Sequence, residues 1–198
     1  MKIFGDLGSG NCLKVKYTAD YLGLPYTWVP IDIMKGESRT PQFLARFPLG
    51  RIPAVELGDG RVLAESNAIV RYLARSSALL PDDAFTQAKI DELLFWEQYS
   101  HEPYVATTRY HIVYLKRSLD QREAWRVERG EAALDTMDRR LLVGRSWLVG
   151  ETMTIADIVL LAYTRLAHEG GFDLSSRPNV RAWIARCEDA LGLEPAKA

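Results

Sequence analysis

The hydrophobic and polar positions follow strand spacing and helix spacing in turn over the first third of the chain. A strand is predicted to Leu7, then a glycine turn at residues 8–10 and a helix to Leu22 with apolar residues at helical spacing. Residues 25–33 alternate as a second strand, and Pro30 within it favours the edge of a sheet because proline cannot donate a ladder hydrogen bond.

The next segment predicts a hairpin followed by a helix. Residues 35–47 are expected to form a loop with a short helix, and residues 52–57 and 61–63 form strands around a Gly-Asp-Gly turn. Ser66 is expected to cap a helix that runs to Ala74. A helix joins the first two strands, so they should be parallel, and the hairpin adds antiparallel strands. This order predicts an α/β thioredoxin-like domain over residues 1–75.

The remainder of the chain is predicted to be all helical. Residues 76–84 break the pattern and are the expected linker to a domain over residues 85–198. Helices are expected at residues 85–115, 119–143, 157–169 and 178–190. Pro103 should interrupt the first of them, and the second should face inward with Trp125, Leu134, Met137 and Leu141. Thr154 and Asp157 form a capping box, with Met153 and Ile158 at the staple positions.

Composition and charge narrow the function classes. The formal net charge of −1 gives no global attraction to nucleic acid or anionic lipid, and no apolar run is long enough for a membrane span. Residues 1–80 carry 10 basic and 7 acidic side chains, so a small anionic ligand would favour this part. The 2 cysteines fall in different predicted domains, which argues against a disulfide framework and fits a reducing, cytoplasmic location.

The turn between the first strand and helix carries candidate chemistry. Ser9-Gly10-Asn11-Cys12 stands where redox proteins of this fold place C-x-x-C, but Ser9 replaces the first cysteine. Helix amides and a hydroxyl aimed at one point would suit an external thiolate. Ser9 could also be an ordinary helix cap, and Cys12 is better interpreted as a small buried hydrophobe than as a nucleophile.

Two further places could bind a peptide-like ligand. Pro53 leads a strand and is a candidate for a cis peptide bond that exposes the main chain of Ile52, although a trans proline fits equally. Glu65 and Ser66 open a helix whose amides attract a carboxylate. Arg39 and Arg51 could neutralise a second carboxylate, or they could simply be solvated cations.

Taken together, these segments resemble the cytosolic glutathione transferases, and most of all the bacterial branches near the theta, beta and nu types. The resemblance rests on G-S-G-N-C-L-K, G-R-I-P-A-V and A-E-S-N-A-I in the first domain and on W-L-V-G-E-T-M-T-I-A-D in the second, and it spans nearly the whole chain. It implies a thioredoxin-like domain followed by an all-helical domain, glutathione as co-substrate, a role in detoxification and a homodimer.

The resemblance also implies residue roles. Ser9 and Asn11 would stabilise the glutathione sulfur, and Ile52 ahead of Pro53 would pair with the cysteinyl unit. The γ-glutamyl end would be held by Glu65 and Ser66, and the glycine carboxylate would lie near Arg51 and Arg39. No tyrosine occupies the first turn, which departs from the tyrosine-type branches, and the absence of a cysteine at Ser9 weakens an omega-like thiol transferase assignment.

The second substrate is expected to be a small hydrophobic electrophile bound by the helical domain. Its pocket would be lined by His101, Tyr104, Thr108 and His111, which share one helical stripe, although such a stripe could equally be a mixed surface or face a dimer partner. With three histidines and no carboxylate at metal spacing, no metal is expected. Conjugation is the predicted reaction. A glutathione-dependent peroxidase or disulfide reductase, and a non-catalytic interaction module, remain as alternatives.

Overall fold

The computed structural model describes residues 1–196 of the chain, and their contacts form two compact units. Unit 1 is Met1–Leu80 and unit 2 begins at Pro81, so the division falls inside the segment expected to be a linker. The elements of unit 1 are β1 (Lys2–Gly5), α1 (Gly10–Tyr21), β2 (Thr27–Pro30), η1 (Glu37–Arg39), α2 (Pro41–Arg46), β3 (Ala54–Glu56), β4 (Val62–Ala64) and α3 (Ser66–Ala74).

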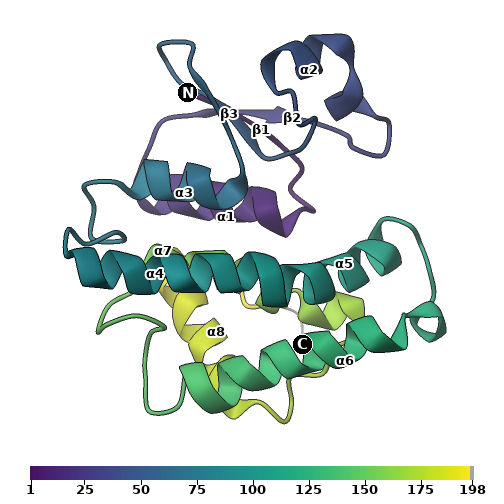
Figure 1. The fold of residues 1–198 in the computed structure, drawn as a ribbon, viewed down its shortest axis with the longest axis vertical. Helices are drawn as coiled ribbons and strands as arrows, with labels where there is room; N and C mark the ends of the chain where they lie inside the picture. Colours follow the sequence, from purple (N-terminus) through teal and green to yellow (C-terminus); the bar gives the residue numbers. More distant parts are fainter. Residues whose placement is uncertain (197–198) are drawn as a thin grey trace. The chain divides into compact units, whose positions relative to one another are not determined.

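Unit 1 is built on a four-stranded sheet with the strand order β2-β1-β3-β4 (Figure 1). β1 is parallel to β2 and antiparallel to β3, and β3 is antiparallel to β4. The predicted parallel pair and hairpin are therefore confirmed, as is the edge position of β2. Pro30 is the last residue of this edge strand and pairs with Gly5 of β1.

The two faces of this sheet are covered by different helices. On one face Phe4 packs with Phe43 and Phe47 of the α2 region and with Ala54. Successive strand residues point to opposite faces, so Ile3 and its register partner Val55 point to the other face, where α1 and α3 lie together (Figure 1). Both faces are thus buried, and the amino ends of α1 and α3 lie in one region of the unit.

Unit 2 is all helical within its described residues. Its elements are α4 (Ala84–Trp96), η2 (Glu97–His101), α5 (Glu102–Val113), η3 (Leu119–Gln121), α6 (Ala124–Thr136), η4 (Met137–Leu141), α7 (Ile155–Thr164), η5 (Ala167–Gly170) and α8 (Pro178–Leu191). Pro103 divides the first long segment as expected. It sits in the first turn of α5, directly after the π-helical turn η2, a position at which a helix tolerates proline.

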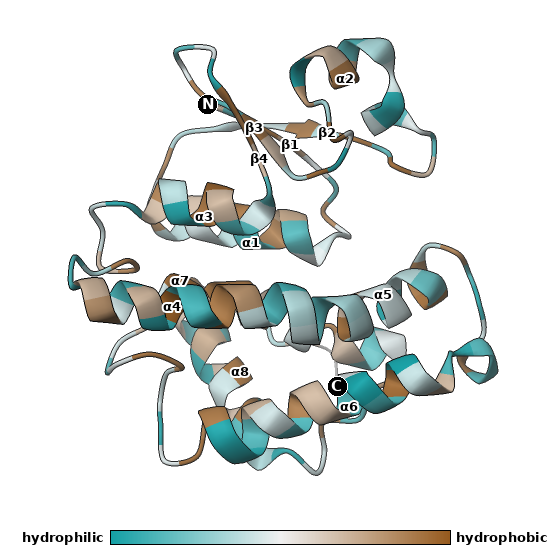
Figure 2. Ribbon diagram, viewed as in Figure 1, coloured by the Kyte–Doolittle hydropathy of each residue, from teal (hydrophilic) through white to brown (hydrophobic). Residues whose placement is uncertain are grey.

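Helix α7 is at the centre of unit 2. All ten of its residues are buried, and the short part of it that is visible in Figure 2 is brown, the hydrophobic end of the colour scale. The predicted staple residues Met153 and Ile158 are both buried. At its start the predicted capping box is present: the Asp157 carboxylate accepts from the Thr154 amide at 2.9 Å, and the Thr154 hydroxyl also lies 3.3 Å from that carboxylate.

Four residues between positions 119 and 143 were predicted to face inward, and the prediction is right for Leu134 and Met137 and wrong for Trp125, while Leu141 is half-buried. Leu134 and Met137 are fully buried, whereas 50% of Trp125 is exposed. The indole lies at the first turn of α6, where it meets Tyr104 edge-on with ring centroids 6.2 Å apart, and the guanidinium of Arg126 lies 4.5 Å from its ring centroid. An aromatic ring flanked by polar groups in this way can remain at the surface.

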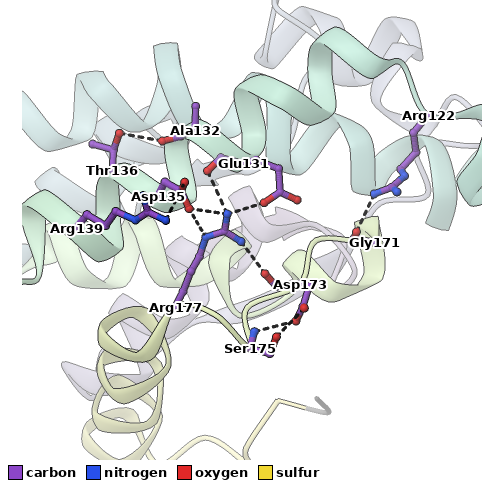
Figure 3. Close-up of polar contacts among 10 residues, drawn as sticks. All are labelled: Arg122, Glu131, Ala132, Asp135, Thr136, Arg139, Gly171, Asp173, Ser175 and Arg177. Carbon is purple, nitrogen blue, oxygen red and sulfur yellow. Dashed lines mark hydrogen bonds and ion pairs between the residues drawn. The ribbon is translucent and has the colours of Figure 1, made fainter.

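A polar network joins α6 to the start of α8 (Figure 3). The guanidinium of Arg177 donates to Asp135 at 2.9 Å, to the Glu131 carboxylate at 2.6 Å and to the Asp173 carbonyl at 2.6 Å. Arg177 is only 6% exposed, and these acceptors satisfy a cation that would otherwise be costly to bury.

Candidate active site

The loop between β1 and α1 is shaped by Asp6. Its carboxylate accepts from the Gly8 amide at 2.8 Å, and its carbonyl accepts from the Ser9 amide at 3.0 Å. Ser9 occupies the N-cap position of α1, but its side chain makes no capping hydrogen bond. The hydroxyl therefore stands beside the amino end of a twelve-residue helix without satisfying its amides, which differs from the ordinary capping role considered for it.

Cys12 lies beneath this turn and is fully buried. The Asp6 amide donates to its sulfur at 3.5 Å. Burial raises the pKa of the Cys12 thiol to about 11, although hydrogen bonds from the Asp6 amide and from Ser9 oppose the shift. A thiol that stays protonated at neutral pH is a poor nucleophile, so Cys12 is a buried core residue, as expected from the sequence.

Asn11 and Ser66 meet although they lie 55 positions apart in the sequence. The Ser66 hydroxyl donates to Asn11 Oδ1 at 3.1 Å. Asn11 lies in the first turn of α1, and Ser66 is the first residue of α3. The structure thus brings together the two places that were expected to bind the sulfur and the γ-glutamyl end of glutathione.

The start of α3 differs from the prediction. The N-cap is Glu65 rather than Ser66, and its side chain makes no capping bond. Glu65 has φ 67° and ψ 113°, in a region that residues with a Cβ seldom adopt. Such strain occurs mainly at functional sites. Glu65 is exposed, and the first amides of α3 are left without a side-chain acceptor from the cap.

The remaining predicted residues of unit 1 form a second group. The Ile52–Pro53 peptide bond is cis, one of the two states considered. Arg51 is exposed just before it. Arg39 is exposed and donates from Nη1 to the carbonyl of Leu49 at 3.3 Å, which places it against the turn that leads into Arg51. The two predicted cations therefore belong to the same part of unit 1.

Sequence reasoning missed the pair formed by Lys14 and Asn67. Lys14 is fully buried, and its Nζ donates to Asn67 Oδ1 at 3.3 Å. Lysine is almost never fully buried without partners, so a helical lysine is ordinarily expected at the surface. The available signal was its position three residues after Asn11, which places both side chains on one face of α1.

The stripe expected to bind the electrophile does not form one open surface. His101 is fully buried, with its Nε2 3.0 Å from the Thr164 hydroxyl, and Thr108 is only 2% exposed. Both side chains pack within unit 2, because the inner face of the α5 segment is covered by its own neighbouring helices, and their place on the electrophile side stays a prediction.

The other two residues of the stripe are half-buried. Tyr104 accepts a hydrogen bond from Arg129 at 2.9 Å and packs against Trp125. His111 lies 3.4 Å from an Arg117 nitrogen, and burial together with nearby Arg117 lowers its pKa. Tyr104 and His111 thus remain predictions for the electrophile side.

Comparison with known proteins agrees with this geometry. The family model "Glutathione S-transferase, N-terminal domain" matches residues 8–76, and "Glutathione S-transferase, C-terminal domain" matches residues 98–190. The chain belongs to the glutathione S-transferase family. The fold is a thioredoxin-like domain followed by a helical domain, as the resemblance implied, and the family is one of transferases.

Relatives from several kingdoms match over most of the chain. The glutathione S-transferase-like protein LUC7 of Fusarium is 34% identical, over 93% of this chain and 87% of the relative. Glutathione S-transferase theta-3 of the mouse is 29% identical, over 97% and 83%. A glutathione S-transferase structure from Pseudomonas fluorescens is 44% identical with a TM-score of 0.91, and it covers 100% of this chain and 96% of that one.

Two kinds of feature are absent from the described part of the chain. No cluster of three or more His, Cys, Asp or Glu side chains within residues 1–196 could hold a metal ion. Across the same residues, no helix is both long enough and apolar enough to cross a membrane.

Proposed function

We propose that unit 1 binds glutathione as a thiolate and that the chain transfers this thiolate to a soft, small hydrophobic electrophile. The observation that carries the proposal is the meeting of Asn11 and Ser66, beside a Ser9 hydroxyl that does not cap its helix. A sulfur donor site and a carboxylate site at the amino ends of two adjacent helices match the two ends of a γ-glutamyl thiol.

In this mechanism the protein stabilises the anion and positions the partner. A free thiol has a pKa near 8.5, and lowering it by about two units requires roughly 2.7 kcal/mol of preference for the thiolate. The Ser9 hydroxyl, the Asn11 amide and the amino end of α1 would supply this preference together. The sulfur then attacks the electrophilic carbon, a C–S bond forms, and the leaving group departs with the electron pair.

The rest of the tripeptide would lie along residues that unit 1 already groups together. The main chain of Ile52, next to the cis bond to Pro53, would pair with the cysteinyl unit. Glu65 would pair with the glutamyl ammonium, and the Ser66 hydroxyl together with the first amides of α3 would hold the glutamyl carboxylate. Arg51 and Arg39 would neutralise the glycine carboxylate.

The experiment that tests the site is an ultraviolet titration of the bound thiol. We expect a lowered pKa for glutathione on the wild-type chain and a higher value in Ser9→Ala, in Asn11→Ala or in both. Ser77→Ala is the matched control, because its hydroxyl donates to the Ala74 carbonyl at the opposite end of α3. An unshifted thiol on the wild-type chain would refute the mechanism.

Parallel assays separate the alternative reactions. Purified protein would be tested with a chlorodinitrobenzene-type electrophile, a hydroperoxide and a mixed disulfide. Conjugation should be the fastest of the three. Faster turnover of the peroxide or disulfide would assign the site to glutathione-dependent reduction, and failure to bind immobilised glutathione would favour an interaction module.

We also propose a homodimer in the cytoplasm. Three aromatic side chains on α4 and η2 support the dimer: Phe85, Phe95 and Tyr99 are 74%, 75% and 82% exposed. Aromatic residues are enriched in protein interfaces. Sedimentation should give a dimer mass for the wild type and a lower mass for Phe95→Glu. Both cysteines are buried free thiols, which fits a reducing compartment.

A further inference from the structure

Unit 2 contains a cavity that the proposed function does not use. Its volume is about 360 Å³, and it lies between the end of α7, η5, the loop before α8, and α8 itself. All of its walls belong to unit 2, and it shares no residue with the site assigned to glutathione. Small-molecule sites in proteins have volumes of about 300–1,000 Å³, so the cavity is large enough for a ligand.

Part of the lining is apolar and sets the size of that ligand. Phe172 is 2% exposed, Ile184 is 8% exposed, and half-buried Leu174 also lines the cavity. A water-sized group occupies roughly 30 Å³, so the volume holds about twelve heavy atoms. This space suits a single ring or a chain of about eight carbons, and it excludes a polycyclic molecule.

The two carboxylates in the lining already have donors. Glu188 Oε1 accepts from Arg165 Nε at 2.9 Å and from the Ala196 amide at 3.0 Å. The Asp173 carboxylate accepts from the amide of Ser175 at 2.8 Å and from its hydroxyl at 2.6 Å (Figure 3). The acidic side chains of the cavity are therefore satisfied by the protein, and Arg165 is committed to its partner.

Two donors in the lining are not committed in this way. Arg181 is exposed on α8, and its guanidinium makes no hydrogen bond or ion pair with residues 1–196. The half-buried ring of His168 on η5 likewise makes no hydrogen bond to any residue that the structure describes. Arg181 does lie near Asp173, whose pKa is lowered first by Ser175 and further by this guanidinium. Direct hydrogen bonds to a ligand would exceed that attraction, because exposed charges without contact interact weakly.

We propose that this cavity binds a small amphipathic carboxylate, with its apolar tail against Phe172 and Ile184 and its headgroup on Arg181 and His168. A carboxylate only accepts hydrogen bonds, whereas the two uncommitted side chains donate them. Its two oxygens match the planar guanidinium, and an imidazole ring offers an N–H in either protonation state. The inference goes beyond the proposed function and does not depend on it.

Calorimetric titration of the full chain with octanoate tests the proposal. We expect one site with a Kd of about 0.1 mM, which is typical of a ligand with about ten heavy atoms. Arg181→Gln should weaken binding by about tenfold or more, because it removes charged hydrogen bonds to the headgroup. Ala185→Phe fills the cavity from an exposed position on α8 and should abolish binding. Octanamide, which has the same tail without the charge, should bind about tenfold more weakly than octanoate.

Two controls locate the site. Arg140→Gln removes an exposed arginine of η4 that does not line the cavity, and it should leave the octanoate affinity unchanged. S-hexylglutathione would occupy both the thiol and the electrophile subsites of the proposed function, and it should not displace octanoate. Arg181 and Ala185 are both exposed, so their variants should fold, which circular dichroism would verify.

Three results would overturn the inference. The first is no octanoate binding to the wild-type chain at concentrations up to about 2 mM, some twentyfold above the expected Kd. The second is equal affinity for octanoate and octanamide, which would mean that no headgroup is recognised. The third is displacement by S-hexylglutathione together with unchanged binding in Ala185→Phe, which would place octanoate in the electrophile site. The thiol titration decides the proposed function separately from all three.

Discussion

Removing the carboxylate of Asp157 should destabilise unit 2 strongly. Asp157 is fully buried and accepts from the Leu148 amide at 2.9 Å, the Thr154 amide at 2.9 Å and the Trp183 indole at 2.9 Å. Three segments of the chain thus meet at one side chain: the loop before α7, the first turn of α7, and α8.

The magnitude follows from these donors. Each buried donor that loses its acceptor costs about 1–3 kcal/mol, and neighbouring losses are not additive. We therefore expect Asp157→Ala to lower the free energy of unfolding by about 4 kcal/mol. Asp157→Asn keeps one acceptor oxygen but points an NH₂ group at another donor, so we expect a loss of about 2 kcal/mol.

The assay is denaturant unfolding followed by circular dichroism and tryptophan fluorescence. In a thermal scan a loss of about 4 kcal/mol corresponds to a midpoint lower by roughly 10 °C. Asp189→Asn is the control, because Asp189 is an exposed carboxylate on α8, and it should be near neutral. A loss below about 1 kcal/mol in Asp157→Ala would refute the reasoning, since it would mean that the three donors find other acceptors.

Three other predictions come from packing and charge. Gly130→Ala would place a Cβ 2.6 Å from ring atoms of the buried Phe172. Although alanine is the better helix former, we expect the free energy of unfolding, measured with denaturant, to fall by about 1–3 kcal/mol. A gain in stability would show that the ring moves freely. Arg177→Lys keeps the charge but loses the planar guanidinium that binds Glu131 and Asp135 together. Because both carboxylates are 38% exposed and partly hydrated, we expect the free energy of unfolding in the same assay to fall by only about 1–2 kcal/mol. The pKa of Cys12 is raised to about 11 in the fold, so the unfolded thiol ionises first as the pH rises, and the contribution of Cys12 to stability should be constant below the usual value of 9.0 and fall between 9.0 and 11. Burial also raises the pKa of Cys187, so Cys12→Ala should make the fall in stability smaller without abolishing it. Alkylation of native Cys12 at neutral pH would contradict that last prediction.

Much of the fold could be predicted from the sequence because its signals are local. Alternating apolar residues, glycine turns and the proline in β2 predicted the parallel pair, the antiparallel hairpin and the edge strand. The capping box and staple located the start of α7 to within two residues. Trp125 was placed wrongly because helical spacing indicates a face, whereas the neighbours that cover that face come from elsewhere in the chain.

The site was only partly predictable for the same reason. A serine, an asparagine and an E-S pair at two helix starts were visible as candidates in the sequence. Neither the hydrogen bond from Ser66 to Asn11 nor the buried Lys14 could be predicted, because both depend on how α1 packs against α3. Helical spacing placed His101 and Thr108 on the stripe expected to line a pocket, but both side chains are buried in the fold.

By itself, the sequence determined the element types, the two-part organisation and the positions of polar groups along the chain, because periodicity and turn residues act over a few neighbouring positions. The tertiary structure alone decided which polar groups meet, which cation is buried and which end of the Asn11 amide is held. Those features require residues some fifty positions apart to approach within hydrogen-bond distance, and only the packing of helices on a common sheet face sets that approach.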